Sequence, residues 1–169
     1  SFKDSIGVVF DEGFFYDELT LTQMKNLIAS SYSHWDNGAY THYLDAFSLR
    51  PDQTISSLSR GMKMKFSLAL ALSHHAELLI MDEPTSGLDP LVRKQFIEIL
   101  KEFMDQGGKA VFYSTHNTSD LDKAADMLVM IDNGKILFEE DKDMLLETHR
   151  LVKGKGLLPA ETKKLFLKV

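Results

Sequence analysis

An apolar run that ends in two carboxylates is the feature that most limits what this chain can fold into. The four residues from Leu78 to Met81 show no alternation of polar and apolar side chains. Such a run is typical of a strand that is buried on both faces of a parallel sheet. Asp82 and Glu83 follow it at once. Because open α/β sheets bind ligands at the carboxyl ends of their strands, the acidic pair marks a candidate ligand site.

Two further segments repeat the pattern of an apolar strand with a polar end. Residues 6–10 (IGVVF) and 110–115 (AVFYST) are short and rich in β-branched or aromatic side chains. Asp11 follows the first segment and His116 follows the second. If the three strands are parallel, these polar residues and the acidic pair gather at one edge of the sheet.

Helices are predicted between the strands, and an antiparallel hairpin is predicted after them. Asp89 followed by Pro90 is a typical helix cap with proline in the first turn. Two apolar runs around Asp132-Asn133-Gly134 predict the hairpin. Strands that alternate with helices indicate an α/β layered domain. The predicted helical segments are 21–47 with a break near 36–38, 59–73 and 90–106.

Composition excludes several classes of protein and site. The length of 169 residues suits one domain with a sizeable core. The longest apolar stretch, residues 66–72, is far shorter than the roughly 20 residues of a membrane-spanning helix. The absence of cysteine excludes disulfides and thiolate metal sites. A net charge of −6 disfavours a nucleic-acid-binding surface, so we expect no nucleic-acid partner.

Four short motifs in order give the chain a resemblance to a known family. They are SLSRGMKMK (57–65), LLIMDEP (78–84), SGLD (86–89) and STH (114–116). In order and spacing they resemble the nucleotide-binding domain, the ATP-binding subunit, of ABC transporters, over residues 6 to about 142. The resemblance implies a P-loop NTPase-like (RecA-like) core with a mostly parallel sheet flanked by helices.

The same resemblance implies a domain organisation. Residues 1–150 would form a partial ABC ATPase domain. Within it, residues 13–75 would be the helical subdomain that includes the signature helix. Residues 151–169 would form a C-terminal tail whose sequence is ambiguous.

The acidic pair suits phosphoryl transfer by its chemistry. Such reactions need a metal that bridges the terminal phosphates and a residue that positions the attacking water. The resemblance implies that Asp82 helps to hold Mg²⁺ and that Glu83 is the general base. Taken alone, the pair would also fit a solvated acidic turn. Asp11 stands where the family usually has a glutamine that touches metal and water, and aspartate is a shorter residue that can also serve a cation.

Histidines divide into one candidate and several surface residues. A lone histidine after a strand is more often structural or exposed than catalytic. Within STH, however, the resemblance implies that His116 is the switch histidine, which senses the γ-phosphate of ATP and assists the water. The other histidines lack metal-ligand spacing with acidic partners, and we predict that they lie on the surface: His34, His42, His74 and His75.

A second group of candidates lies at predicted helix starts. Ser59 is expected to cap a helix whose free amides face an anion. The resemblance implies that Ser59, Arg60 and Gly61 contact the γ-phosphate bound to the opposite subunit of a head-to-tail dimer, and that Asp89 lies in the loop joining the two sites. A plain helix cap is the alternative for both. Arg60 replaces the usual glycine, and either strengthens the phosphate contact or points to solvent.

The phosphate cradle GxxxxGK[ST], which supplies backbone amides and a lysine to phosphates, is absent from the chain. In the family this Walker A region lies upstream of the residues matched here, and the chain begins with Ser1 directly before strand-like sequence. We therefore expect a C-terminal fragment of an ABC transporter ATP-binding subunit. We expect these residues to be inactive alone and to tend to associate.

The resemblance also implies the function of the whole protein. It would bind Mg²⁺ and ATP, hydrolyse ATP at the dimer interface, and drive an integral membrane permease from the cytoplasmic side, peripheral to the inner face of the cell membrane. Residues 13–57 would meet the permease, with Phe14, Phe15 and Tyr16 either contributing there or packing in the core. Two alternatives stay open: a soluble ABC-type ATPase that is not a transporter, and a non-catalytic module that donates its signature motif to a partner.

Overall fold

The computed structural model describes residues 2–10 and 14–148. The chain divides into two compact units, residues 1–124 and 125–169. The predicted tail, residues 151–169, lies outside the described residues, as does Asp11.

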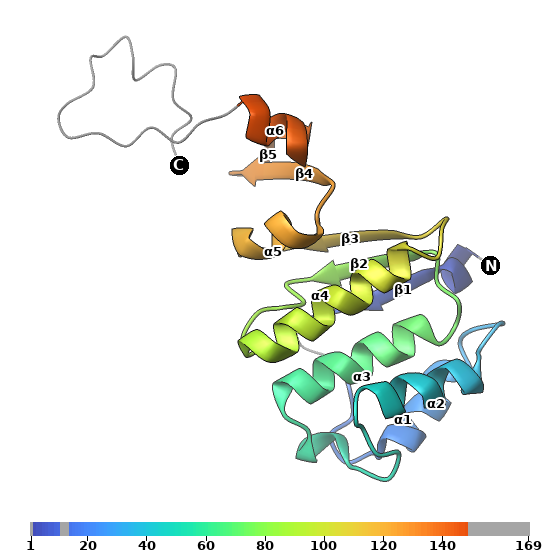
Figure 1. Ribbon diagram of the computed structural model, residues 1–169. Helices are drawn as coiled ribbons and strands as arrows, with labels where there is room; N and C mark the ends of the chain where they lie inside the picture. The colour runs from blue at the N-terminus through green and yellow to red at the C-terminus, as the bar shows by residue number, and fades with distance from the viewer. Residues whose placement is uncertain (1, 11–13, 149–169) are drawn as a thin grey trace. The chain divides into compact units, whose positions relative to one another are not determined.

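A parallel sheet is the centre of the first unit (Figure 1). Its strands are β1 (Ile6–Val9), β2 (Leu78–Asp82) and β3 (Ala110–Ser114), in the order β1-β2-β3. Both pairings are parallel, as the sequence predicted. All three strands therefore have their carboxyl ends at one edge of the sheet.

Helices flank this sheet, which confirms the predicted α/β class. The helices of the first unit are α1 (Leu21–Ala29), α2 (Asn37–Ala46), α3 (Arg60–Leu72), α4 (Pro90–Met104) and α5 (Thr118–Ala124), with 3₁₀ turns at Phe2–Ser5 and Ile55–Ser57. The predicted break near 36–38 falls earlier in the structure. Asp36 Oδ1 accepts a hydrogen bond from the backbone N–H of Ala39 at 3.0 Å, so Asp36 caps α2 instead of interrupting a helix.

The core of the first unit forms where α3 and α4 meet one face of the sheet. Leu79 of β2 is fully buried there, together with Phe66 of α3 and Leu100 of α4. Gly7 lets β1 approach α3 closely, because a Cβ at this position would lie 3.0 Å from the Cβ of Ala71. The packing therefore fixes the sheet against the two helices whose starts carry predicted site residues.

The other face of the sheet differs from the expectation. Val8, Ile80 and Phe112 lie in register across the three strands, and their side chains are 42%, 36% and 63% exposed. The prediction that the strand at 78–81 is buried on both faces is therefore wrong in this structure. A short apolar run has the same sequence pattern whether or not a second layer covers its outer face. The pattern alone therefore does not show how many faces of the strand are buried.

The second unit contains the predicted hairpin. Strands β4 (Met127–Asp132) and β5 (Lys135–Asp141) are antiparallel, and α6 (Lys142–Thr148) follows them. Asn133 and Gly134 both have positive φ, 47° and 73°, as the tight turn at an Asn-Gly sequence requires.

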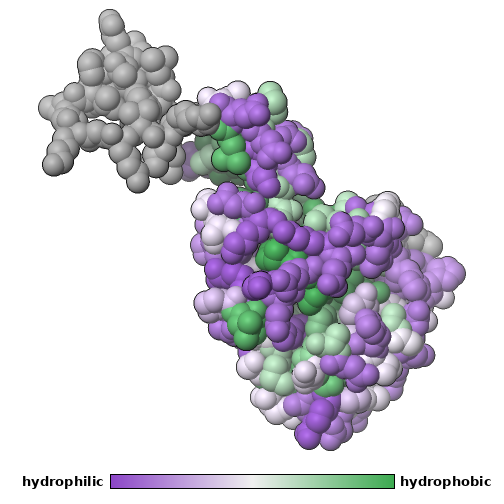
Figure 2. Space-filling model, in the orientation of Figure 1, coloured by the Kyte–Doolittle hydropathy of each residue, from purple (hydrophilic) through white to green (hydrophobic). Residues whose placement is uncertain are grey.

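Membrane-spanning helices are absent from the described residues: none of the helices within 2–10 and 14–148 combines the length and apolar character needed. Figure 2 shows hydrophilic residues over most of the visible face, with smaller hydrophobic areas between them.

Candidate active site

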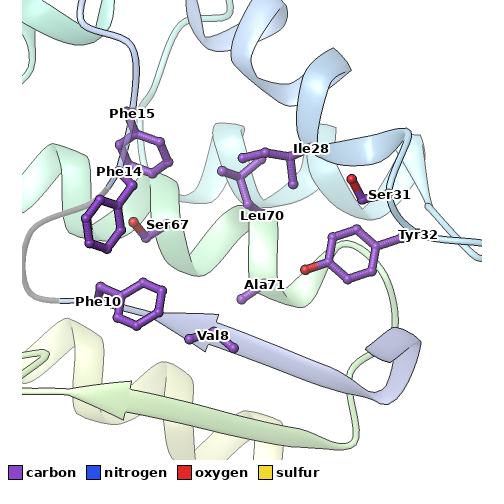
Figure 3. A pocket seen from close by; sticks show the side chains of 10 residues that line it. All are labelled: Val8, Phe10, Phe14, Phe15, Ile28, Ser31, Tyr32, Ser67, Leu70 and Ala71. Atoms are coloured by element: carbon purple, nitrogen blue, oxygen red, sulfur yellow. The ribbon is translucent and has the colours of Figure 1, made fainter. Parts of the chain in front are cut away.

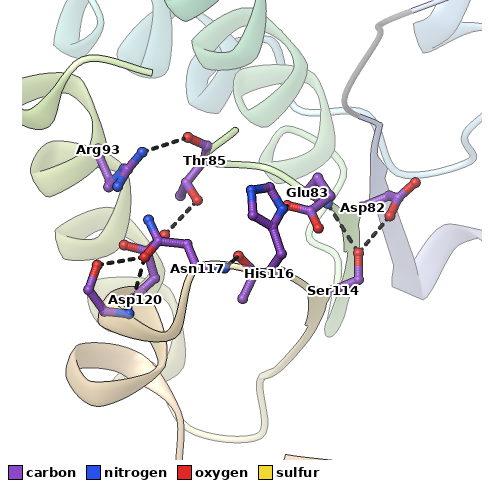
Figure 4. A network of polar contacts seen from close by, with 10 residues as sticks. Asp82, Glu83, Thr85, Arg93, Ser114, His116, Asn117 and Asp120 are labelled. Carbon is purple, nitrogen blue, oxygen red and sulfur yellow. Dashed lines mark hydrogen bonds and ion pairs between the residues drawn. The ribbon is translucent and has the colours of Figure 1, made fainter. Parts of the chain in front are cut away.

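Asp82 and Glu83 are tied to the end of the neighbouring strand. Asp82 is paired in register with Ser114, the last residue of β3. The Ser114 hydroxyl donates a hydrogen bond to Asp82 Oδ1 at 2.6 Å and accepts one from the Glu83 backbone N–H at 3.2 Å (Figure 4). Sequence reasoning quoted Ser114 within STH but gave it no role. The signal that could have identified Ser114 is its position opposite Asp82 when the two strands are parallel.

Glu83 and His116, both predicted to be catalytic, lie against each other. His116 Nδ1 is 2.8 Å from Glu83 Oε2, an ion-pair contact without the alignment of a full hydrogen bond (Figure 4). The side chain of His116 is 77% exposed and that of Glu83 is 28% exposed. The edge of the sheet thus places a half-buried carboxylate beside an accessible imidazole.

The backbone at Glu83 is held in an unusual conformation. Its φ is +45°, in the left-handed region that residues other than glycine rarely adopt. The Glu83 N–H donates to the Ser114 carbonyl at 3.1 Å, and the Glu83 carbonyl accepts from the Ser86 N–H at 3.0 Å. Non-glycine residues held in this region cluster at functional sites, where the surroundings over-determine them.

Metal-binding capacity at this edge rests on Asp82. Its carboxylate is exposed and is a hard oxygen ligand of the kind that Mg²⁺ prefers. Within residues 2–10 and 14–148, no group of three or more His, Asp or Glu side chains could hold a metal ion by itself. Mg²⁺ usually keeps several waters and binds one or two carboxylates together with substrate phosphates, so the donors at this edge fit such an ion.

The second group of predicted residues lies at the starts of α3 and α4. The Ser59 side chain accepts a hydrogen bond from the Met62 N–H at 3.3 Å and caps α3. The Asp89 side chain accepts from the N–H groups of Leu91 and Val92, each at 3.0 Å, and caps α4. Both predicted caps are confirmed.

These two helix starts are in contact. A Cβ built on Gly61 of α3 would lie 3.4 Å from Val92 of α4. Arg60 is exposed, but its guanidinium lies against Gly87, where a Cβ would come within 2.6 Å of Arg60 Nη1. Arg60 therefore contacts the loop before Asp89 instead of simply pointing to solvent. The loop from Glu83 to Asp89 connects this group with the Glu83–His116 pair.

His74 corrects one prediction. It is only 1% exposed, whereas His34, His42 and His75 are exposed as predicted. The His74 ring stacks on Tyr32 at 3.8 Å, and its Nδ1 lies 3.0 Å from the carbonyl of Asp4. Burial lowers the pKa of His74. Position in the fold, just after α3, decides this burial, and the sequence around His74 gives no periodic sign of it.

Thr85 and Asp120 form a buried polar pair near this site that sequence reasoning missed. The Thr85 hydroxyl donates to Asp120 Oδ2 at 2.6 Å (Figure 4). Thr85 lies between the LLIMDEP and SGLD motifs, but nothing in the sequence links it to Asp120, which is 35 residues away.

An open apolar cavity of about 320 Å³ lies between β1 and the helices α1 and α3 (Figure 3). Phe10 and Phe14 line it and meet edge to face at 5.4 Å. Phe14 is 82% exposed, while Phe15 packs against the buried Phe66 at 5.2 Å. Of the three aromatic residues predicted for this segment, Phe15 therefore joins the core, whereas Phe14 and Tyr16 are exposed.

Comparisons with known proteins give one matching family model and relatives that are ATP-binding proteins. The family described as "AAA domain, putative AbiEii toxin, Type IV TA system" matches residues 18–122. The bacitracin transport ATP-binding protein BcrA of Bacillus licheniformis is 30% identical over 86% of this chain and 48% of its own length. The Nod factor export ATP-binding protein I of Rhizobium sp. (strain N33) is 37% identical over 59% of this chain and 33% of its own. The chain thus spans between a third and about half of these relatives.

The solved structures add the fold. CbiO1 from Clostridium perfringens, part of the ABC transporter complex CbiONQ, matches with a TM-score of 0.70 over 86% of this chain and 61% of that chain. At 20% sequence identity this likeness shows a common fold. The predicted P-loop NTPase-like core is therefore confirmed.

Proposed function

The chain belongs to the AAA domain family and, with its curated relatives, to the ATP-binding proteins of ABC transporters, and from this premise we propose that it is part of a subunit that binds and hydrolyses ATP to drive transport across a membrane. The observation that carries the proposal is the 2.8 Å contact between Glu83 and His116 at the edge of the sheet, next to Asp82. A residue that positions the attacking water and an acid that holds the metal are groups that phosphoryl transfer to water uses.

Each residue at the sheet edge has a proposed task. Glu83 accepts the proton of a water molecule as its oxygen attacks the γ-phosphorus and the bond to the bridging oxygen of ADP breaks. His116, whose Nδ1 is 2.8 Å from Glu83 Oε2, orients Glu83 and senses the γ-phosphate. Asp82 would hold Mg²⁺, which neutralises phosphate charge when bound. The Asp82–Ser114 hydrogen bond keeps this carboxylate oriented.

The helix starts supply the second half of a composite site. We propose that Ser59, Arg60 and Gly61 face ATP held by another ATPase subunit, homologous or identical, in a head-to-tail dimer, with Asp89 at the junction. Support comes from the exposure of Ser59, Arg60 and Asp89 and from the contact between the starts of α3 and α4. A capped helix N-terminus of this length presents free N–H groups to an anion.

The apolar cavity is the proposed contact with an integral membrane permease. Its exposed phenylalanines, Phe10 and Phe14, are unfavourable in water and would be covered by an apolar segment of the permease. We propose that the subunit lies on the cytoplasmic side of the membrane, peripheral to its inner face. It also fits relatives named for transport and export.

Phosphate binding needs residues beyond these 169. No GxxxxGK[ST] sequence is present among them, so we expect no ATP hydrolysis from these residues alone, where the acids at the sheet edge would repel a triphosphate. ATP turnover is therefore measured on the whole protein.

Steady-state phosphate release by the whole protein tests the proposal. Glu83→Gln should lower turnover about 10²- to 10⁴-fold, the usual contribution of general acid–base catalysis. Glu98→Gln, an exposed carboxylate on α4, is the matched control and should match wild type. Turnover of Glu83→Gln within threefold of wild type would rule Glu83 out as the general base, and no turnover by wild type would favour a non-catalytic module.

A further inference from the structure

A hydrogen bond buried beneath the proposed active site joins the segments that follow two neighbouring strands. The Thr85 hydroxyl donates to Asp120 Oδ2 at 2.6 Å, and the two residues are 1% and 0% exposed (Figure 4). Thr85 lies two positions after Glu83, in the loop that leaves β2. Asp120 lies four positions after His116, in α5. The bond therefore connects the supports of the two residues that meet at 2.8 Å.

The burial of the Asp120 carboxylate beside Thr85 costs folding free energy. A buried carboxylate is costly unless hydrogen bonds satisfy it, and among the described residues Asp120 Oδ1 has no hydrogen-bond partner. Loss of the Thr85 hydroxyl would remove the bond to Oδ2 as well. The negative charge of Asp120 also acts on its surroundings, since it adds to burial in raising the pKa of Tyr113 to about 12.

Thr85 is also bound through its backbone. Its carbonyl accepts from Arg93 Nη2 of α4 at 3.4 Å and from the Leu88 N–H at 3.2 Å. Three segments therefore converge on this one residue: the loop after β2, helix α4 and helix α5. Glu83, which precedes this fixed point by two residues, has the strained φ of +45° that requires such support.

We propose that Thr85 and Asp120 act as a buried clamp that positions Glu83 and His116 for hydrolysis. The inference rests on the function proposed above and assigns to Thr85 and Asp120 a positioning role, with no contact to substrate. The clamp keeps the loop after β2 and the segment after β3 in register at a depth that water does not reach. Without it, Glu83 relaxes from its left-handed conformation and the contact with His116 lengthens.

The test compares Thr85→Val, Thr85→Ser and Asp120→Leu in the whole protein. Valine keeps the shape of threonine without the donor, serine keeps the hydroxyl, and leucine has a similar size to aspartate without an acceptor. We expect Thr85→Val and Asp120→Leu to lower kcat about 10- to 100-fold with little change in KM, the size of effect that a misplacement of about 1 Å produces. Thr85→Ser should stay close to wild type.

A double-mutant cycle separates positioning from general destabilisation. Thr85→Val combined with Asp120→Leu should be no slower than either single variant, because the bond is already lost in each. Additive losses in kcat, or losses that appear in KM as much as in kcat, would overturn the clamp. Should Thr85→Val not fold, Thr85→Ser and Asp120→Leu decide: the clamp requires a near-normal kcat in the first and a reduced kcat in the second.

Failure of the clamp is distinguishable from failure of the proposed function. If the whole protein hydrolyses ATP, Glu83→Gln abolishes this, and Thr85→Val keeps kcat within twofold of wild type, the clamp alone is wrong. If the wild-type whole protein does not hydrolyse ATP, the proposed function is wrong, and if Glu83→Gln turns over like wild type, Glu83 is not the base; in either case the clamp falls too.

Discussion

At the scale of single residues, the positive φ of Glu83 links stability to chemistry. A non-glycine residue in the left-handed region costs roughly 1–2 kcal/mol, and this cost disappears for glycine. Because glycine also gains freedom in the unfolded chain, we expect Glu83→Gly to raise the free energy of unfolding by at most about 1 kcal/mol while removing ATP turnover. Urea unfolding and phosphate release on one preparation measure both. A strongly destabilised Glu83→Gly protein would show that φ carries no strain.

Gly87 offers a second residue-scale prediction, with a matched control in Gly107. Both have positive φ, 67° and 74°, but a Cβ at Gly87 would meet Arg60 at 2.6 Å whereas one at Gly107 has nothing within 4 Å. Gly107→Ala and Gly87→Ala should each cost about 1 kcal/mol from backbone strain, because the guanidinium of the exposed, flexible Arg60 side chain can move away from a Cβ at Gly87.

The cost of Gly87→Ala should therefore stay the same in an Arg60→Ala background, as measured by denaturant unfolding. A Gly87→Ala protein that loses much more stability than Gly107→Ala, with the excess removed by Arg60→Ala, would show instead that the Arg60 guanidinium is held rigidly against Gly87.

At the scale of elements, the sequence predicted those features that local residue patterns determine. Capping residues placed the starts of α3 and α4 at Ser59 and Asp89, and the polar ends of β2 and β3 predicted that Glu83 and His116 meet. Helix starts and strand ends are local signals, which is why they could be read. The exposed face of β2 and the burial of His74 depend on which other elements pack there, so the local sequence does not predict them.

The segment after α3 should give the protein a pH-dependent stability through His74. Burial lowers the pKa of His74 below its ordinary value of 6.5, so the unfolded chain takes up a proton more readily than the folded protein. The contribution of neutral His74 to the free energy of unfolding is therefore fully present above about pH 6.5, and it is lost as the pH falls from there toward the lowered pKa. We expect wild type to lose more stability between pH 7.5 and 5.5 than His74→Phe.

Urea unfolding at the two pH values tests this. Phenylalanine cannot titrate and can keep the stacking on Tyr32, while the exposed His34, His42 and His75 are common to both proteins and cancel. His42→Gln is the control and should keep the wild-type dependence. Equal losses in wild type and His74→Phe would exclude His74 as the source.

At the scale of the whole molecule, the residues of the proposed chemistry lie in the first unit, and the proposed head-to-tail dimer would complete the site. Ser59→Phe should therefore lower ATP turnover of the whole protein strongly while leaving nucleotide affinity of the monomer unchanged. Loss of the α3 cap should itself cost about 1 kcal/mol, so Ser59→Thr, which keeps a capping hydroxyl, is the control. Calorimetry on the monomer gives the affinity. A parallel loss of monomer affinity would contradict the head-to-tail arrangement.

The proposed hydrolysis of ATP depends most on Glu83, the residue proposed to activate water. The most direct measurement is the nucleotide recovered from the whole protein after incubation with Mg²⁺ and ATP, separated by chromatography into ATP and ADP. We predict ADP from wild type and intact ATP from Glu83→Gln, since the change leaves the phosphate contacts in place and removes the proton acceptor. ADP in equal amounts from both proteins would contradict the account.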